Sequence, residues 1–229
     1  MATVMIVGAT RGIGLELVRQ HSAEGDKVIA CARDTNAAEK LDEVAAGAGN
    51  IDIVQLDIAD PASIEAAGKT VGDQAIDTVI IVAGVVGGAH QSVDDIDIEE
   101  WHRTLDANTI GPLLVARTFK PNLVASGKGN LMIVSSQLGA STWPMGGMYI
   151  YSSTKAAVGK VGKILSIDWA AEPIIISIMH PGWVQTDMGG PHAEITAEES
   201  ASGIRKVIAG LTKEDSGNFY KWNGDIHPW

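Results

Sequence analysis

The stretch that decides the fold is "TVMIVGATRGIG", residues 3–14. A run of apolar and β-branched residues passes directly into a turn that contains Gly8, Gly12 and Gly14, and the helical pattern of "LELVRQH" follows. This order of strand, glycine turn and helix is typical of a site where the pyrophosphate of a dinucleotide approaches the backbone and a helix N-terminus. The spacing is G-x-x-x-G-x-G rather than the commoner G-x-G-x-x-G, and a glycine-rich turn without a ligand is the alternative.

The same alternation of short apolar runs and helical stretches continues along the chain. Strands are predicted at 3–8, 27–32, 51–56, 77–84, 130–136 and 174–180, and they are apolar throughout, as strands buried on both faces are. Helices are predicted at 12–24, 36–46, 61–72, 97–126 and 151–171, with another from about Thr196.

This pattern predicts an α/β fold, a doubly wound and mostly parallel sheet of about seven strands with helices on both faces. No linker or repeat interrupts it, so we expect a single Rossmann-type domain over residues 1–229. Residues 1–90 are predicted to form mainly the cofactor half. Residues 91–229 are predicted to form the catalytic and substrate half, with a short lid at about 183–196.

Composition narrows the class of protein. The net charge of −11 argues against a general nucleic-acid binder or a protein that binds anionic membranes. No apolar run approaches the roughly 20 residues of a membrane span, and the start lacks the pattern of a signal peptide. Cys31 is the single cysteine, which excludes an intrachain disulfide. We therefore expect a cytoplasmic protein.

Two arginines bear on the choice of cofactor. An NAD site usually has an acidic residue at the end of the second strand, where this chain has Arg33. With Arg11 in the glycine turn, two guanidinium groups are available for a 2′-phosphate, so NADP(H) is favoured over NAD(H). Asp34 is the counter-evidence, because it could bind a ribose if the strand ends one residue later. Asp57, after the third strand, is either an adenine ligand or a simple strand-end aspartate.

The segment "YIYSSTK", residues 149–155, holds the candidate for acid–base chemistry. In a helix that begins near Tyr151, that tyrosine and Lys155 lie on one face, whereas Tyr149 has Ser153 four residues on. A phenol is a poor acid–base group at neutral pH unless a nearby cation favours its phenolate, and Lys155 supplies that charge. A hydroxyl at the end of the preceding strand, from Ser135 or Ser136, could bond a carbonyl oxygen of the substrate.

Together these motifs resemble the short-chain dehydrogenase/reductase family. The resemblance spans the chain: "GATRGIG", "LDIAD", "NTIGP", "SSQLG", "YSSTK" and "HPGWVQTDM". The layout "SSQLG…GGMYIYSSTKAAV", with "HPGWVQTDMGG" and "NGDIHPW", is most similar to the C-factor/sniffer-type carbonyl reductase branch.

The resemblance implies an NADPH-dependent oxidoreductase that reduces a ketone or aldehyde. It implies that Tyr151 is the general acid, that Lys155 lowers the pKa of Tyr151 and binds the nicotinamide ribose, and that Ser136 orients the carbonyl. Asn108 would hold a water that connects Lys155 to solvent. The remaining cofactor-binding residues it implies are Gly8, Thr10, Arg11, Gly12, Ile13, Gly14, Arg33, Asp57, Ala83, Gly84, Pro181, Gly182, Val184 and Thr186.

Three departures from the family pattern stand out. Val82 replaces the second asparagine of a common Asn-Asn-Ala-Gly run, Ser152 stands where the branch often has arginine, and the loop from Ser136 to Tyr151 is long. The first puts a hydrogen bond at the centre of the sheet in doubt. The long loop makes the choice of serine less secure than that of the tyrosine.

Several residues could line a substrate pocket. Beside Ser136 they are Trp143, Met145, Met148, Trp183 and Met188, which favour a hydrophobic or aromatic small-molecule carbonyl substrate. The histidines show no metal-ligand spacing, so no metal is expected, and His180 is interpreted as structural. Relatives of this type imply a homodimer or homotetramer. The alternative function is a cofactor-binding signalling or regulatory protein, which the C-factor likeness allows.

Overall fold

A seven-stranded sheet forms the centre of the computed structural model, which describes all 229 residues. The order is β3-β2-β1-β4-β7-β8-β9, and every pairing within the sheet is parallel. The strands are β1 (Thr3–Val7), β2 (Lys27–Ala32), β3 (Ile51–Gln55), β4 (Thr78–Ile81), β7 (Gly129–Val134), β8 (Ile174–His180) and β9 (Phe219–Lys221). The predicted doubly wound α/β fold is confirmed. Its order reverses between β1 and β4, where such sheets bind ligands.

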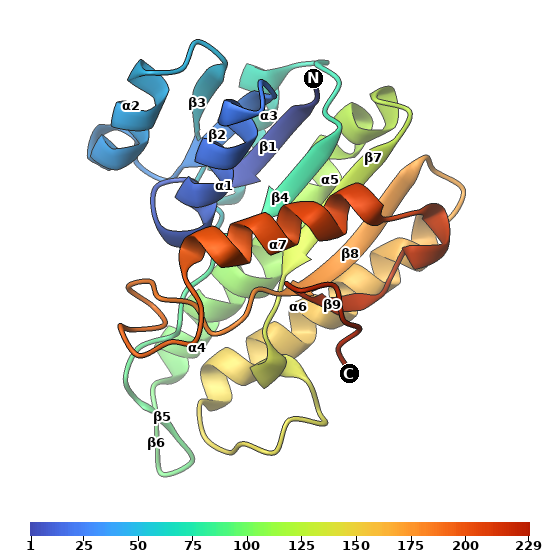
Figure 1. The fold of residues 1–229 in the computed structure, drawn as a ribbon. Coiled ribbons are helices and arrows are strands. Elements are labelled where there is room, and N and C mark those ends of the chain that lie inside the picture. Colours follow the sequence, from blue (N-terminus) through green and yellow to red (C-terminus); the bar gives the residue numbers. More distant parts are fainter.

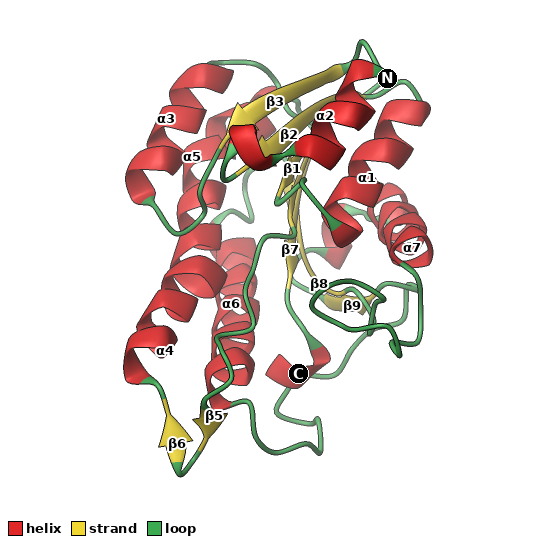
Figure 2. Ribbon diagram, turned by 90° about the vertical axis from the view of Figure 1, so that its left-hand side faces the viewer, coloured by secondary structure: helices red, strands yellow, loops and turns green.

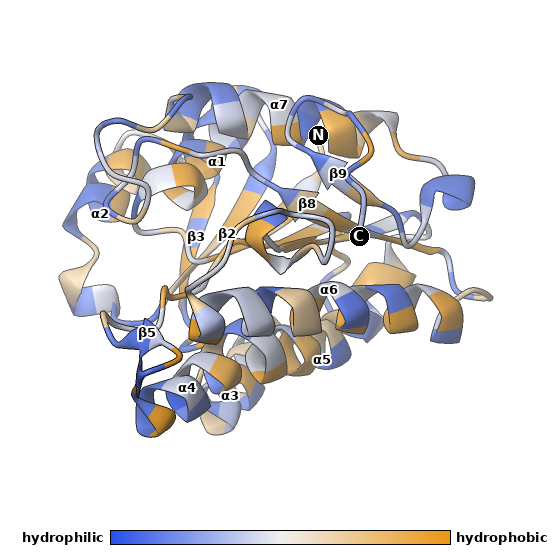
Figure 3. Cartoon of the chain, turned by 90° about the horizontal axis from the view of Figure 1, so that it is seen from below, coloured by the Kyte–Doolittle hydropathy of each residue, from blue (hydrophilic) through white to orange (hydrophobic).

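Helices cover both faces of the sheet (Figures 1 and 2). One layer contains α1 (Gly12–Ala23), α2 (Glu39–Ala46) and α7 (Ala197–Gly210). The other contains α3 (Pro61–Val71), α4 (Ile98–Leu105), α5 (Gly111–Ala125) and α6 (Tyr149–Asp168). Apolar strands lie between the two layers of helices (Figure 3). Their side chains pack with those of the helices in two large core clusters of 23 and 18 buried residues. No helix combines the length and the apolar character that a membrane crossing requires.

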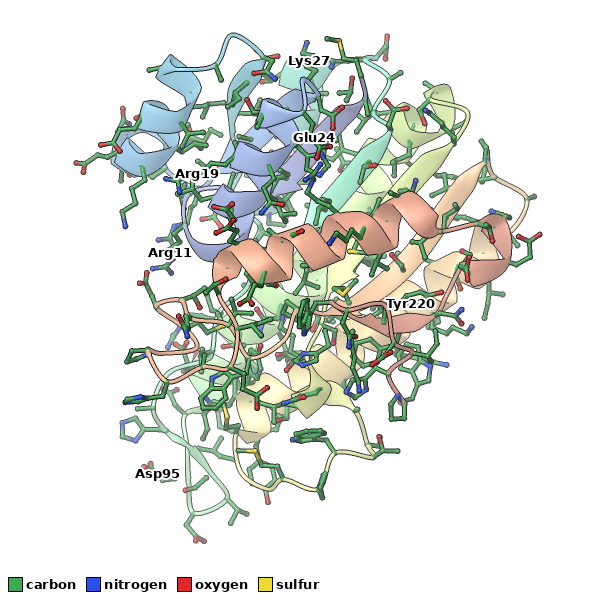
Figure 4. All side chains as sticks on the ribbon, viewed as in Figure 1. Arg11, Arg19, Glu24, Lys27, Asp95 and Tyr220 are labelled. Atoms are coloured by element: carbon green, nitrogen blue, oxygen red, sulfur yellow. The ribbon has the colours of Figure 1, made fainter.

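The seventh strand comes from the aromatic C-terminal segment, for which the sequence predicted no element. Phe219 pairs with Ile178 of β8, and the Tyr220 hydroxyl donates to Asp215 at 2.9 Å (Figure 4). The segment is therefore part of the sheet edge. Strand β9 was missed because it is only three residues long and is defined by its partner strand.

The prediction of one continuous helix over residues 97–126 is wrong. A π-helical turn, Asp106–Ile110, separates α4 from α5, and a Cβ at Gly111 would lie 2.0 Å from the carbonyl oxygen of Ile58. Between β4 and α4 lies a hairpin that was not predicted, formed by β5 (Gln91–Ser92) and β6 (Asp95–Ile96). It projects below the sheet in Figure 1. The helix placed at 151–171 begins two residues earlier, at Tyr149.

Candidate active site

The carboxyl ends of the central strands meet at one edge of the sheet. The glycine turn after β1, the loop after β4, the loop after β7 and residues 181–196 after β8 all lie at this edge, in the lower part of Figure 1. Parallel sheets place their binding sites here, because strand ends that are distant in sequence come together. Most residues of the predicted site lie in these segments. The exceptions are Tyr151 and Lys155 in α6, Asn108 in the π-helical turn, and Arg33 and Asp57, which follow β2 and β3.

The glycine turn is packed too tightly for side chains. A Cβ at Gly8 would lie 2.8 Å from the backbone of Ala83, and one at Gly14 would lie 2.0 Å from the carbonyl oxygen of Gly8. Gly12 has a φ of +53°, and a Cβ there would lie 2.9 Å from Cγ2 of Thr186. The turn therefore contacts the end of β4 and the loop after β8, which brings Ala83 and Thr186 beside it.

Helix α1 begins without a cap of its own. Its N-cap residue, Arg11, makes no side-chain capping bond, and the first turn has no acidic residue. The first N–H groups of a helix have no intrahelical partner, and the helix dipole places partial positive charge there. An open N-terminus beside a glycine turn fits the pyrophosphate of a dinucleotide.

The two arginines lie in different surroundings. Arg11 is exposed and pairs with Asp187 of the loop after β8, at 3.0 Å (Figure 4). Arg33 lines a hollow of about 560 Å³ together with Asp57 and Asp60. The Asp34 carboxylate accepts from the N–H of Asn36 at 2.9 Å, so it caps a local 3-10 turn. This geometry favours Arg33 over Asp34 as the ligand-facing side chain.

Tyr151 and Lys155 occupy successive turns of α6, with Nζ of Lys155 5.8 Å from the centre of the phenol ring. Lys155 is buried, and its ammonium donates to the carbonyl of Val134 at 3.0 Å. Tyr149 is 45 % exposed and lies on another side of the helix. The structure therefore brings one of the two tyrosines to the lysine, and that tyrosine is Tyr151.

Burial shifts the pKa values of both groups. It lowers the pKa of Lys155 to about 8, and it raises the pKa of Tyr151, which a hydrogen bond with Ser136 counteracts in part. The expectation that Lys155 lowers the pKa of Tyr151 stays a prediction, because the upward shift of this phenol arises from its burial. Removal of the phenol from water outweighs the favourable interactions, because desolvation penalises the phenolate.

The two serines at the end of β7 have separate roles. The Ser135 hydroxyl donates to the carbonyl of Lys155 at 2.8 Å, in a fully buried contact that holds α6 against the sheet. The Ser136 hydroxyl accepts from the N–H of Leu138 at 3.2 Å, and it lies close enough to the Tyr151 phenol to lower the pKa of that group. Of the two, Ser136 is the serine beside the phenol.

The side chain of Asn108 joins the loop after β4 to α6. Its Oδ1 accepts from the N–H of Val85 at 2.8 Å, and its Nδ2 donates to the Val85 carbonyl at 2.8 Å and to Thr154 Oγ1 at 3.0 Å. Both amide protons are thus engaged by the protein. Gly84 lies alongside, since a Cβ there would be 3.0 Å from Asn108 Oδ1 and 3.2 Å from Lys155 Nζ.

The predicted pocket residues lie on the two loops that follow β7 and β8. Trp143, Met145, Trp183 and Met188 are between 39 and 60 % exposed. Met148 directly precedes α6 and has a left-handed φ of 52°. The loop after β8 is closed on itself, because Val184 bridges Ile195 and Trp183 Nε1 donates to the Gly189 carbonyl at 2.8 Å.

Two further buried side chains lie near the site. The sequence analysis interpreted His180 only as structural and gave Gln91 no role. His180 ends β8, and its Nδ1 accepts from the N–H of Gln137 at 3.3 Å, which anchors the residue after Ser136. Burial lowers the pKa of His180 to about 4, so the ring is neutral and can accept this bond. Gln91 accepts from the N–H of Tyr151 at 3.0 Å. No local pattern reveals Gln91, because its partner lies sixty residues away.

The sheet is of the Rossmann type, with an open helix N-terminus at a glycine turn and with a serine, a tyrosine and a lysine nearby. This is the architecture of a nicotinamide-dependent oxidoreductase. Comparison with known proteins agrees. Residues 2–197 match the family model for short chain dehydrogenases, and the chain belongs to this family.

Three similar proteins place the chain within the family. C-signal from Myxococcus xanthus is 37 % identical over 155 residues, which are 67 % of this chain and 93 % of that protein. The crystal structure of NADPH-bound carbonyl reductase from chicken fatty liver superposes with a TM-score of 0.93 at 31 % identity, covering 100 % of this chain and 94 % of that one. The carbonyl reductase Sniffer of D. melanogaster gives 0.92 at 26 % identity, with 100 % of both chains covered. The predicted likeness to C-factor and sniffer-type relatives is confirmed.

Proposed function

We propose that this oxidoreductase uses NADPH to reduce a ketone or aldehyde to an alcohol. The observation that carries the proposal is the group formed by Ser136, Tyr151 and Lys155 at the carboxyl ends of the strands, next to Gly84 and the glycine turn. A bound nicotinamide would supply the hydride for the carbonyl carbon. The residues of this chain then have to orient the carbonyl and deliver one proton to its oxygen.

Tyr151 is the proposed proton donor. A phenol has an ordinary pKa of about 10 and burial raises the pKa of Tyr151 further, so the group is protonated at neutral pH and holds a proton to deliver. Ser136 lies beside the phenol, and its hydroxyl would turn to donate to the carbonyl oxygen that receives the proton from Tyr151, which would hold the substrate between two hydroxyl groups. The positive charge of Lys155, on the next turn of α6, would stabilise the phenolate that forms as the proton leaves.

The cofactor would lie across the reversal point of the sheet. The N-terminus of α1, with Thr10, Gly12, Ile13 and Gly14, would hold the pyrophosphate. Arg33 would bind the 2′-phosphate and Asp57 the adenine, since both line one hollow. Pro181, Gly182, Val184 and Thr186 would border the nicotinamide. The NADPH bound to the chicken carbonyl reductase supports this choice of cofactor.

The proposed substrate is a hydrophobic or aromatic carbonyl compound. The side chains on the two loops at this edge are mainly apolar and large, with Trp143, Met145, Trp183 and Met188 exposed to an incoming ligand. Their exposure also gives the substrate apolar surface to cover when it binds.

The test is the oxidation of NADPH with a panel of activated ketones, aldehydes and diketones. Tyr151→Phe should lower kcat by about 100- to 10,000-fold, the range for loss of a general acid, with thermal stability retained. Tyr149→Phe is the matched control, because it removes the neighbouring phenol outside the group, and it should leave kcat within about twofold of the wild type. A wild-type protein that binds NADPH and reduces no member of the panel would exclude the proposal.

A second candidate is a signalling or regulatory protein that binds the cofactor, supported by the 37 % identity to C-signal. In that case Tyr151→Phe would keep the cellular effect, whereas a change at Gly12, which has positive φ and contacts Thr186, would abolish it. The Ser136–Tyr151–Lys155 group favours the enzyme, because a sensor has no need for a proton donor.

A further inference from the structure

Helix α6, which carries the proposed proton donor, does not cap its own N-terminus. Its N-cap residue Met148 is left-handed, with φ 52° and ψ 42°, and makes no side-chain capping bond. Tyr151 is the third residue of the helix, the position whose N–H an N-cap side chain often accepts. Here the acceptor is Oε1 of Gln91, at 3.0 Å and sixty residues earlier in the chain.

The remaining bonds of Gln91 go to the loop after β4. Nε2 donates to the carbonyls of Val86 and Gly88, both at 2.9 Å, and the side chain is buried. Both amide protons and the amide oxygen are therefore used. A single side chain connects this loop to the backbone of the residue that carries the phenol.

The loop itself is packed against the first turn of α6. A Cβ at Gly87 would lie 2.6 Å from Cγ2 of Ile150, and Asn108 bonds the N–H and the carbonyl of Val85 from the other side. Gly84 also lies in this loop, and a Cβ there would lie 3.2 Å from Lys155 Nζ. Two buried amides, Asn108 and Gln91, thus fix the loop to α6.

We propose that Gln91 is a positioning residue for carbonyl reduction, which sets the phenol of Tyr151 relative to the loop after β4. This inference rests on the proposed function. Without the Gln91 amide, the Tyr151 N–H and the Val86 and Gly88 carbonyls lose their partner, and each unpaired buried group is costly. The first turn of α6 can then shift or fray, and a displacement of about 1 Å at a reacting group lowers the rate about 100-fold.

Asn122 provides a matched control far from the site. It is also a buried amide whose Nδ2 donates to two backbone carbonyls, of Gly72 at 2.7 Å and Gln74 at 2.8 Å. It lies in α5, near the amino ends of the strands. Gln91→Leu and Asn122→Leu therefore each remove a buried amide that donates two bonds to a loop, but only the first concerns α6.

The experiment compares kcat, KM and hydrogen exchange in the two leucine variants. Gln91→Leu should lower kcat about 10- to 100-fold, with little change in the KM for NADPH, and should speed exchange in the peptide 149–155. Asn122→Leu should lower the melting temperature by a similar amount, with kcat within about twofold of the wild type. Equal effects of the two variants on kcat, or unchanged exchange in 149–155 for Gln91→Leu, would overturn the proposal.

Gln91→Glu nearly preserves the shape of the side chain, and the ionisation of the new carboxyl makes the expected effect on kcat depend on pH. When ionised, the introduced carboxyl can accept from the Tyr151 N–H but cannot donate to Val86 or Gly88, and protonation restores one donor. The ratio of kcat for the variant to kcat for the wild type should rise several-fold from about pH 8 to about pH 5. The neighbouring pair His90–Asp95, and Glu100 beside Gly88, are present in both proteins, so they largely cancel in the ratio.

A flat ratio over this range would count against the proposal even if Gln91→Leu does not fold. Failure of the proposed function has a different signature, because the wild type would then reduce no carbonyl compound. The exchange of 149–155 in Gln91→Leu or Gln91→Glu would still show whether Gln91 holds the start of α6, and unchanged exchange would exclude the positioning role.

Discussion

The helices of this protein begin in two ways. Three of them cap themselves from their own sequence. Asp60 accepts from the N–H of Ala62 at the start of α3, Asp97 accepts from Glu100 in α4, and Thr196 forms a capping box with Glu199 in α7. The two helices that border the site, α1 and α6, have no such cap.

The two helices that border the site lack the stability that a local cap provides, and their first N–H groups are left for other partners. A self-capped helix satisfies its first N–H groups within a few residues, which contributes about 1 kcal/mol. At α1 these groups stay free for an anion, and at α6 one is bonded by Gln91 from a distant loop. Two other helices lack a side-chain cap: α5 continues directly from the π-helical turn, and in α2 Glu39 and Asp42 of the first turn complement the dipole. Local rules are thus broken most clearly at the two helices that the proposed reaction uses.

The largest effect is expected when the buried charge of Lys155 is removed from α6, one of the two helices that border the site without a cap of their own. Lys155→Met should lower kcat by at least about 100-fold, because the charge that stabilises the phenolate is lost. It should also raise the free energy of unfolding at pH 7 by about 1–2 kcal/mol. Burial of the ammonium costs about 3 kcal/mol from its lowered pKa, and the unpaired Val134 carbonyl offsets part of the gain.

The pH dependence of that gain follows from the sign of the shift. The folded protein holds its Lys155 proton less tightly than the unfolded chain, with a pKa of about 8 against 10.5. The wild type therefore gains stability as pH rises through this window, and the advantage of Lys155→Met is complete below about pH 8 and shrinks above it. Urea unfolding at several pH values measures the difference. An advantage independent of pH would show that Lys155 is not the cause.

A smaller effect is expected from giving α1 a cap. Arg11→Ser places a capping hydroxyl at an extended N-cap and should stabilise the fold by about 0.5–1 kcal/mol. The ion pair with Asp187 is exposed, so its loss should subtract little. NADPH affinity should fall about tenfold, because the hydroxyl competes for the N–H groups and a guanidinium is lost. Thermal unfolding and fluorescence titration with NADPH measure both quantities.

Asp97→Ala is the control for that variant, since it removes a cap from a helix outside the cofactor site. It should cost about 1 kcal/mol in the free energy of unfolding and leave NADPH affinity unchanged. If Arg11→Ser binds NADPH as tightly as the wild type, the open start of α1 is not the anion site.

The smallest effect is expected at Arg33, the residue proposed to bind the 2′-phosphate of the cofactor. Arg33→Ala should weaken NADPH binding a few-fold to about tenfold and leave NADH binding nearly unchanged, because only NADPH carries the 2′-phosphate. The ratio of the two dissociation constants is the measurement. Equal affinities of the wild type for both cofactors would remove the case for Arg33 in the hollow that it shares with Asp57.

Much of the fold could be predicted because its signals are local. Six of the seven strands are apolar runs, and the glycine turn follows β1 with no intervening residue to obscure it. The pairing of Tyr151 with Lys155 needed only the helical repeat, which places residues four apart on one face. The seventh strand was missed because its three residues are defined by pairing with β8, which is distant in the sequence. The hairpin was missed because each of its strands has only two residues, and the π-helical turn because it interrupts an otherwise continuous helical pattern.

The sequence by itself determined the class of protein, the glycine turn and the helical face that Tyr151 shares with Lys155, since these depend on residue type and short spacing. Only the tertiary structure shows which serine lies beside the Tyr151 phenol, because adjacent residues of an extended chain point to opposite sides and the spacing does not say which side faces that ring. It also decided the direction of the Tyr151 pKa, which depends on burial, and the bond from Gln91 to α6. Burial and contacts across sixty residues arise only when the whole chain packs.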